Sequence, residues 1–195
     1  MTWLILFLVA ALVIGPIAYL LPSAKDKRLG ALRLHARQLG LSVKLVSLPK
    51  LDPQPQERVN ASGRPLEPKR SCVAYQLPAA HDLELTDEVV WVAIPSLPTV
   101  VYEEVAPGWA SAQLPAPSEA ARANLQKLAV VPKQALADCL RSDLLEIIGF
   151  GISARFVALY WSEKGSAETG EVEEIKHILD KISDLLPGKT ADTTE

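Results

Sequence analysis

The chain has 195 residues, 49% of them hydrophobic, and a formal net charge of −3 at pH 7. Residues 1–22 form an apolar segment, and the remaining length suffices for one domain with a proper core, or at most two very small ones. The two cysteines, Cys72 and Cys139, exclude a disulfide framework, and their spacing matches no metal motif. We expect both to be buried free thiols.

The charge is unevenly distributed along the chain. Residues 25–70 contain eleven Lys or Arg and four acids, whereas residues 71–195 contain nine Lys or Arg and nineteen acids. The basic half therefore adjoins the apolar segment. Charge asymmetry of this kind indicates membrane topology.

The apolar run from Trp3 to Leu21 contains nineteen residues without a charge. A helix of that length spans about 28 Å, close to the thickness of the hydrocarbon core of a bilayer. Trp3 and Tyr19 fall near its two ends, where amphipathic rings prefer to lie. We therefore predict a single transmembrane helix at residues 1–22.

A cleaved signal peptide is the alternative, because Pro22, Ser23 and Ala24 imitate a small-residue cleavage site. Three features argue against it: residues 1–24 contain no Lys or Arg, the apolar run is longer than the usual h-region, and the cations follow the segment directly. Cytoplasmic flanks carry such an excess of Lys and Arg. We expect a retained anchor in the inner membrane, with the N-terminus outside and the rest of the chain in the cytoplasm.

Residues 23–40 predict a basic amphipathic helix next to the anchor. Ser23 and Asp26 have the spacing of a capping box, and Gly40 stands where a left-handed C-terminal cap is expected. Apolar residues at helical spacing form one stripe, namely Leu29, Leu32, Ala36 and Leu39.

The cations of this helix lie mostly off the stripe and are predicted to flank the membrane: Lys25, Lys27, Arg28, Arg33 and Arg37. One interpretation is that the leucines pack on the domain while the cations face solvent. The other is that the cations contact anionic lipid headgroups. The two are compatible, and we favour core packing with incidental lipid attraction. No aromatic residues are interleaved with the cations, so nucleic-acid binding is not expected.

We expect residues 41–187 to form the cytoplasmic domain. Leu41, Val43 and Leu45 alternate with polar residues and indicate a half-buried strand at 41–48. A Pro-rich loop at 49–70, with five prolines, has little capacity for regular structure. Further strands are expected at 71–77, at 89–94 as a central strand, and at 99–105 as an antiparallel neighbour of 89–94.

The second half of the domain predicts helices around one strong strand. Helices are expected from Ser118 or Glu119 to Lys127 or Leu128, from Lys133 to about Leu145, and at 171–186. Gly149 and Gly151 are interpreted as an interruption before the last strand, which is expected at 152–162. Residues 188–195 form a polar tail that is predicted to be disordered. This order without βαβ alternation indicates an α+β fold, with a mostly antiparallel sheet covered by helices on one face.

The sequence offers few candidates for chemistry. It contains no P-loop, GxGxxG, GxSxG or HExxH motif, and no cofactor or metal site is predicted. Asp82, Glu84 and Asp87 bunch with Glu88 between two strands, where acids are usually solvated. Trp109 follows the turn signal Pro107-Gly108; it is either an exposed contact for a partner protein or packed in the core.

These features predict a membrane-anchored accessory or scaffold protein without enzymatic activity, whose domain binds a protein partner. An outward N-terminus, a basic flank and a small cytoplasmic domain resemble the layout of accessory subunits of bacterial inner-membrane complexes, an analogy without a shared motif. Two alternatives stay open. One is a membrane-tethered enzyme that uses loop carboxylates such as Asp82, Glu84 and Asp87; the other is a module centred on residues 25–37 that responds to anionic lipid.

Overall fold

The computed structural model describes residues 2, 3, 7, 12, 23–79, 85, 87–95, 102, 104–112, 119–128, 131–163 and 168–186. The predicted anchor, residues 1–22, therefore lies outside the described residues at all but four positions, and the predicted tail, 188–195, lies wholly outside them. Among the residues described, no helix is both long and apolar enough to cross a bilayer.

The described residues form helices and strands in the following order along the chain. These are α2 (Ala24–Gln38), β1 (Ser42–Pro49), the 3₁₀ turn η1 (Pro55–Glu57), β2 (Lys69–Pro78), β3 (Val89–Ala93), β4 (Glu104–Ala106), β5 (Trp109–Ser111), α3 (Glu119–Leu128), α4 (Lys133–Cys139), β6 (Ile147–Ile152), β7 (Phe156–Trp161) and α5 (Thr169–Leu185).

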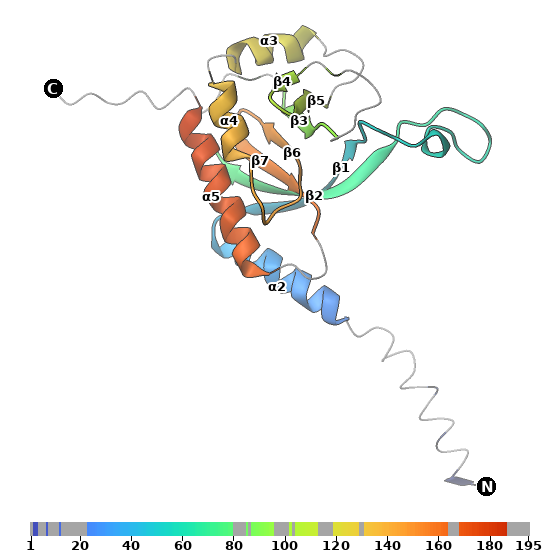
Figure 1. Ribbon diagram of the computed structural model, residues 1–195. Helices are drawn as coiled ribbons and strands as arrows, with labels where there is room; N and C mark the ends of the chain where they lie inside the picture. Colours follow the sequence, from blue (N-terminus) through green and yellow to red (C-terminus); the bar gives the residue numbers. More distant parts are fainter. Residues whose placement is uncertain are drawn as a thin grey trace, which may run out of the picture.

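The seven strands make one sheet in the order β1-β2-β7-β6-β3-β5-β4 (Figure 1). Every described strand pair is antiparallel. The predicted α+β class with a mostly antiparallel sheet is therefore confirmed, and β3 is an interior strand as predicted.

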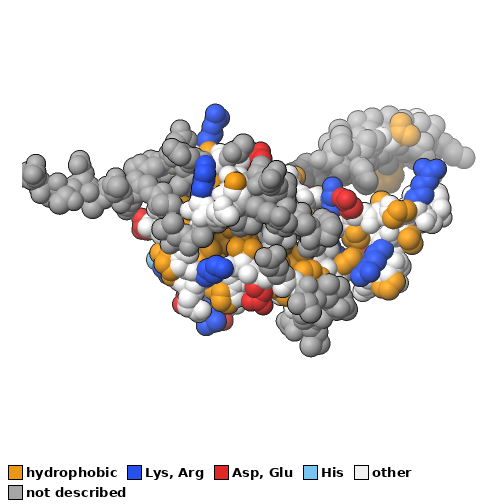
Figure 2. All heavy atoms as spheres, turned by 90° about the horizontal axis from the view of Figure 1, so that it is seen from above, with side chains coloured by type: hydrophobic (Ala, Val, Ile, Leu, Met, Phe, Trp, Pro, Cys, Tyr) orange, Lys and Arg blue, Asp and Glu red, His pale blue; other side chains and the backbone are white. Residues whose placement is uncertain are grey.

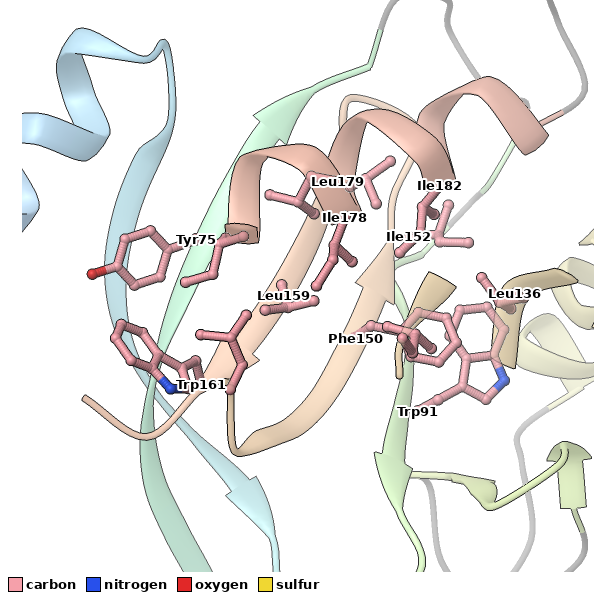
Figure 3. Close-up of a cluster of buried hydrophobic side chains, with 14 of the residues drawn as sticks. Tyr75, Trp91, Leu136, Phe150, Ile152, Leu159, Trp161, Ile178, Leu179 and Ile182 are labelled. Carbon is pink, nitrogen blue, oxygen red and sulfur yellow. The ribbon is translucent and has the colours of Figure 1, made fainter. Parts of the chain in front are cut away.

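Helices α2 and α5 lie against the same side of the sheet, over β1, β2 and β7, and α4 packs beside α5 (Figure 1). The apolar face of α5 is buried there. It contributes five residues to the main core: Val172, Ile175, Ile178, Leu179 and Ile182. Figure 3 shows Ile178 and Ile182 directed at the sheet residues Leu159 and Ile152. A second, smaller apolar cluster includes Leu48, Ala74 and Tyr160, which alternate with core-facing residues of the same strands.

The strand predicted at 152–162 contains β7 (Phe156–Trp161), but the strand before it, β6 (Ile147–Ile152), was not predicted. Gly149 and Gly151, interpreted as an interruption, lie within β6. A Cβ on Gly149 would stand 2.5 Å from the backbone oxygen of Trp91 in β3, so β6 needs glycine to approach its neighbour. The glycines mark close strand approach rather than a loop.

The strand predicted at 99–105 overlaps β4 at residues 104–105, and residues 99–101 and 103 lie outside the described residues. The described strand begins at Glu104 and ends at Ala106, and Gly108 (φ +80°) makes the turn into β5. It is β5 that pairs with β3, with Trp109 opposite Ala93. The turn signal was recognised, but the short strand after it was not.

Helix α4 ends at Cys139 rather than near Leu145. Leu140 closes it, with its N–H bonded to the carbonyls of Asp138 and Leu136. Beyond this point Ser142 Oγ accepts a hydrogen bond of 3.3 Å from the N–H of Leu144. Such side-chain-to-backbone bonds compete with helical ones, which explains the early end.

Candidate functional site

Helix α2 begins as the sequence predicts. Ser23 Oγ accepts a hydrogen bond of 3.2 Å from the N–H of Asp26, and the carboxylate of Asp26 accepts one of 3.2 Å from the N–H of Ser23. The Ser23 hydroxyl also donates to the Asp26 carboxylate at 2.7 Å, and this bond, together with the one from the Ser23 N–H, lowers the pKa of Asp26. Ser23 itself has an extended backbone (φ −62°, ψ 162°), as a helix N-cap does, so α2 begins at Ala24.

The inner side of α2 packs on the domain. Leu32 and Ala36 are buried in the main core, and Leu29 and Leu39 pack against it at the edge. The predicted apolar stripe is therefore confirmed. Gly40 takes the left-handed conformation (φ +81°) that turns the chain into β1.

The predicted membrane-flank cation Arg33 has another role in the structure. Its Nη2 lies 2.5 Å from Glu163 Oε2, and its Nε donates at 3.2 Å to both carboxylate oxygens. The hydroxyl of Tyr75 donates to Glu163 Oε1 at 2.7 Å. Because the Glu163 side chain is only 4% exposed, this carboxylate is buried between its two donors. Arg33 joins α2 to the end of β7, and sequence reasoning missed Glu163, which lies 130 residues further on.

The pKa values of this network favour the protonated forms of both donors. Hydrogen bonding to Glu163 raises the pKa of Arg33. Burial, reinforced by the hydrogen bond to Glu163, raises the pKa of Tyr75 above its ordinary value. At neutral pH the Tyr75 phenol is therefore neutral and the Arg33 guanidinium is charged.

Alkaline pH is expected to weaken the fold through Tyr75. Since its pKa is raised in the folded state, its contribution is complete below the unfolded pKa of about 10 and is lost as the pH rises towards the folded value. The loss amounts to about 1.4 kcal/mol per pH unit in that window. We expect Tyr75→Phe to lower the free energy of unfolding by about 1 kcal/mol at neutral pH, but to flatten its decline above pH ~10.

This prediction is checked by urea unfolding of the full chain in mild detergent at a series of pH values. Tyr160 also has a pKa raised by burial, and its contribution cancels when the variant is compared with the native chain. If the free energy of unfolding of the two proteins depends on pH in the same way, the pKa of Tyr75 does not differ between the folded and unfolded states, and the prediction is wrong.

The outer side of α2 faces solvent. Lys27 and Arg37 are exposed there, and Leu34, 58% exposed, falls between them on the helix. Arg28 is exposed as well. Of the five predicted cations, Lys25, Lys27, Arg28 and Arg37 are thus exposed and Arg33 is half-buried.

Lys25 and Arg33 line an open cleft of about 510 Å³ between α2 and the edge of the sheet. Its other walls come from Leu29, from residues 45–47 of β1 and 71–73 of β2, and from residues 162–163. We call this the α2–β1 cleft. Its apolar surface includes Leu45, which is 75% exposed although it was predicted to be half-buried with Leu41 and Val43. The cleft separates Leu45 from the first turns of α2, which explains the difference.

The remaining candidates do not form a second site among the described residues. Asp82 and Glu84 lie outside those residues; Asp87 is exposed, and Glu88 accepts a hydrogen bond from the Tyr160 hydroxyl. Within the described residues there is no group of three or more His, Cys, Asp or Glu able to hold a metal ion. Lys and Arg side chains stand apart from one another on the face seen in Figure 2.

The two cysteines are free thiols, as predicted, and they differ in burial. Cys72 is buried, and desolvation raises its pKa to about 11. Cys139 is half-buried, and burial also raises its pKa. Thiols with raised pKa values are poor nucleophiles at neutral pH.

Trp109 belongs to the core, so the alternative of an exposed partner contact was wrong. It lies in β5 rather than in a loop, and its side chain is 8% exposed. Its ring meets that of Phe150 edge to face, with the centroids 5.2 Å apart, and Phe150 stacks on Trp91 at 4.5 Å. Three rings thus join β3, β5 and β6.

Comparison of the chain with models of protein families, with curated proteins and with solved structures finds no match. The features of the chain that bear on function are therefore the α2–β1 cleft and the two sides of α2.

Proposed function

We propose that the protein is a single-pass, membrane-anchored accessory or scaffold protein whose cytoplasmic α+β domain binds a protein partner in a bacterial inner-membrane complex. The observation that carries the proposal is the docking of α2 on the domain. This helix begins directly after the apolar segment, and Leu32, Ala36 and the Arg33–Glu163 ion pair fix it to the sheet. An anchor before Ser23 would therefore hold the domain close to the bilayer in a set orientation, without a flexible linker.

Such an arrangement suits a protein that presents a surface rather than one that searches for a substrate. From Ser23 to Pro49 the chain is helix, tight turn and strand, with no polar linker of the kind that lets tethered domains swing freely. The cations that flank the apolar segment support an inward-facing domain.

The test of the anchor uses the full chain expressed in a bacterial host. We expect the protein to stay in the membrane pellet after alkaline carbonate extraction, with an intact mass that includes residues 1–24. A reporter that functions only in the cytoplasm should be active when it is fused to the C-terminus. A reporter that functions only outside the cytoplasm should be inactive there. As a control, the double change Val9→Lys and Val13→Lys should release the protein, because charges in the centre of the span oppose insertion. A mature protein that begins near Lys25 would overturn the anchor.

The test of the partner is co-purification in mild detergent followed by mass spectrometry. We expect the same protein to be recovered repeatedly with the native chain. Recovery of the chain alone would count against a scaffold.

The outer side of α2 favours a second candidate function, a response to anionic lipid. Lys27, Leu34 and Arg37 combine cations with one exposed apolar side chain, as helices at membrane surfaces do. The full chain in nanodiscs, spin-labelled at position 34, tests it. If the helix contacts lipid, the spin label in discs with anionic lipid should be more accessible to oxygen than to a polar nickel reagent. The difference between the two accessibilities should decrease at high salt. Equal accessibility in both kinds of disc would exclude it.

A further inference from the structure

We propose that β1 and the α2–β1 cleft bind an extended, acidic segment of the partner protein, which adds to the sheet as an eighth strand beside β1. This inference rests on the proposed function, to which it adds the binding site and the chemistry of the partner. Strand addition gives affinity through main-chain hydrogen bonds and specificity through pockets for alternate side chains.

The two edges of the sheet differ in how well they resist such pairing. At one edge β4 has three residues, and its register with β5 shifts between Glu104 and Ala106. At the other, β1 has eight residues in unbroken register with β2, from Ser42 opposite Gln76 to Pro49 opposite Lys69. Among the described strands, β1 pairs only with β2. Short or irregular edges prevent pairing with other chains, whereas long regular edges permit it.

Charged side chains that usually protect an edge are turned away at β1. Its one internal charge is Lys44, and the Lys44 ammonium lies 5.7 Å from the centroid of the Phe156 ring. Since Phe156 belongs to β7, two strands inward, this charge reaches back across the sheet rather than beyond its edge. The next residue, Leu45, is instead the most exposed large apolar side chain among the described strands.

The cleft supplies the pocket that strand addition needs. Leu45 and Ser47 point to the same face of β1, because side chains alternate along a strand, and both line the cleft with Leu29. Every second side chain of a strand added beside β1 would face this cleft. Apolar side chains at those positions would cover Leu29 and Leu45, which solvent now reaches.

Charge favours an acidic partner over a second copy of this chain. Residues 23–50 contain seven Lys or Arg and one acid, Asp26. Pairing of two β1 strands would place two such segments side by side, and like charges in close apposition are unfavourable. Within the cleft, Arg33 already neutralises Glu163, and the ammonium of Lys25 at the cleft wall supplies a positive charge for a carboxylate of the partner.

The experiment selects short random peptides displayed on phage against the full chain in mild detergent. We expect enriched peptides in which apolar and acidic residues alternate. A selected peptide, synthesised with a fluorescent label, should bind the native chain, and Leu45→Asp should weaken its binding by at least about tenfold. Hydrogen exchange of the amides of β1 should slow when the peptide is bound.

Leu34→Asp is the matched control, because it places the same charge on another exposed leucine, on the outer side of α2. It should leave peptide binding unchanged. Urea unfolding of both variants confirms that they fold. Selection without enrichment, or a peptide that binds Leu45→Asp as tightly as the native chain, would overturn the proposal. So would self-association of the native chain that Leu45→Asp abolishes, since the occupant would then be a second copy.

Failure of this inference is distinguishable from failure of the proposed function. Release of the chain by carbonate together with retained peptide binding would remove the anchor and leave the strand site intact. Retention in the membrane, with a partner whose recovery Leu45→Asp does not affect, would preserve the scaffold function and place its contact elsewhere.

Discussion

Gly149→Ala is expected to destabilise the domain by about 3 kcal/mol, the upper end of the range typical of overpacking. The added Cβ would lie 2.5 Å from the backbone oxygen of Trp91 and 3.1 Å from Leu48 Cδ1. The first obstacle is main chain of the paired strand β3, so no side-chain rotation relieves it. Either β3 and β6 separate locally, or the Trp91–Phe150 stack shifts.

The matched control is the same substitution at Gly30 in α2. A Cβ there would meet no atom within 4 Å, and the residue is in the interior of a helix. Gly30→Ala should therefore stabilise the protein by about 0.5–1 kcal/mol. Urea unfolding of the full chain, followed by tryptophan fluorescence, measures both changes. Similar effects at the two positions would contradict the close approach of β6 to β3.

Arg33→Ala is expected to cost about 2 kcal/mol of stability. Breaking a buried ion pair by removal of one partner typically costs about 3–5 kcal/mol, because a charge is left buried without compensation. Here the cost is reduced, because the Arg33 side chain is 34% exposed and water can screen the remaining charge. Arg37→Ala, an exposed position on the same helix, should change stability by no more than about 0.5 kcal/mol.

A double-mutant cycle separates the ion pair from the loss of packing. Glu163→Gln keeps an acceptor for the Tyr75 hydroxyl while it removes the charge that faces Arg33. If the pair is coupled as the distances indicate, the combined change should cost less than the two single changes added together, by about 1–3 kcal/mol. Additive costs would mean that Arg33 contributes only through the contacts of its aliphatic part.

The sequence predicted those elements whose signals are local. Ser23 with Asp26, and Gly40 after the stripe, set the ends of α2, and the apolar face of α5 follows from spacing alone. β6, which contains Gly149, could not be recognised in the same way. Glycine inside a strand and glycine in a loop have the same sequence signal, and only the position of β3 distinguishes them.

The candidate site was predictable only in part, because it depends on contacts between distant segments. The cations of α2 are visible in the sequence, but nothing local tells that Arg33 meets Glu163 while Lys27 faces solvent. Leu45 follows the alternating pattern of a buried residue, and its exposure results from the divergence of α2 and β1. The reverse holds for Trp109, which was considered as an exposed residue but is buried. Its strand, β5, is too short to give a recognisable pattern in the sequence.

The contact between α2 and α5 also has a consequence for the order of events during synthesis. These are the first and last helices of the domain, and Glu163, which holds Arg33, lies just before α5. While the ribosome is still translating the middle of the chain, α2 has neither its helical neighbour nor its counter-ion. Because α2 cannot close on α5 before residues 163–185 have been synthesised, this contact is expected to form late in the folding of the domain.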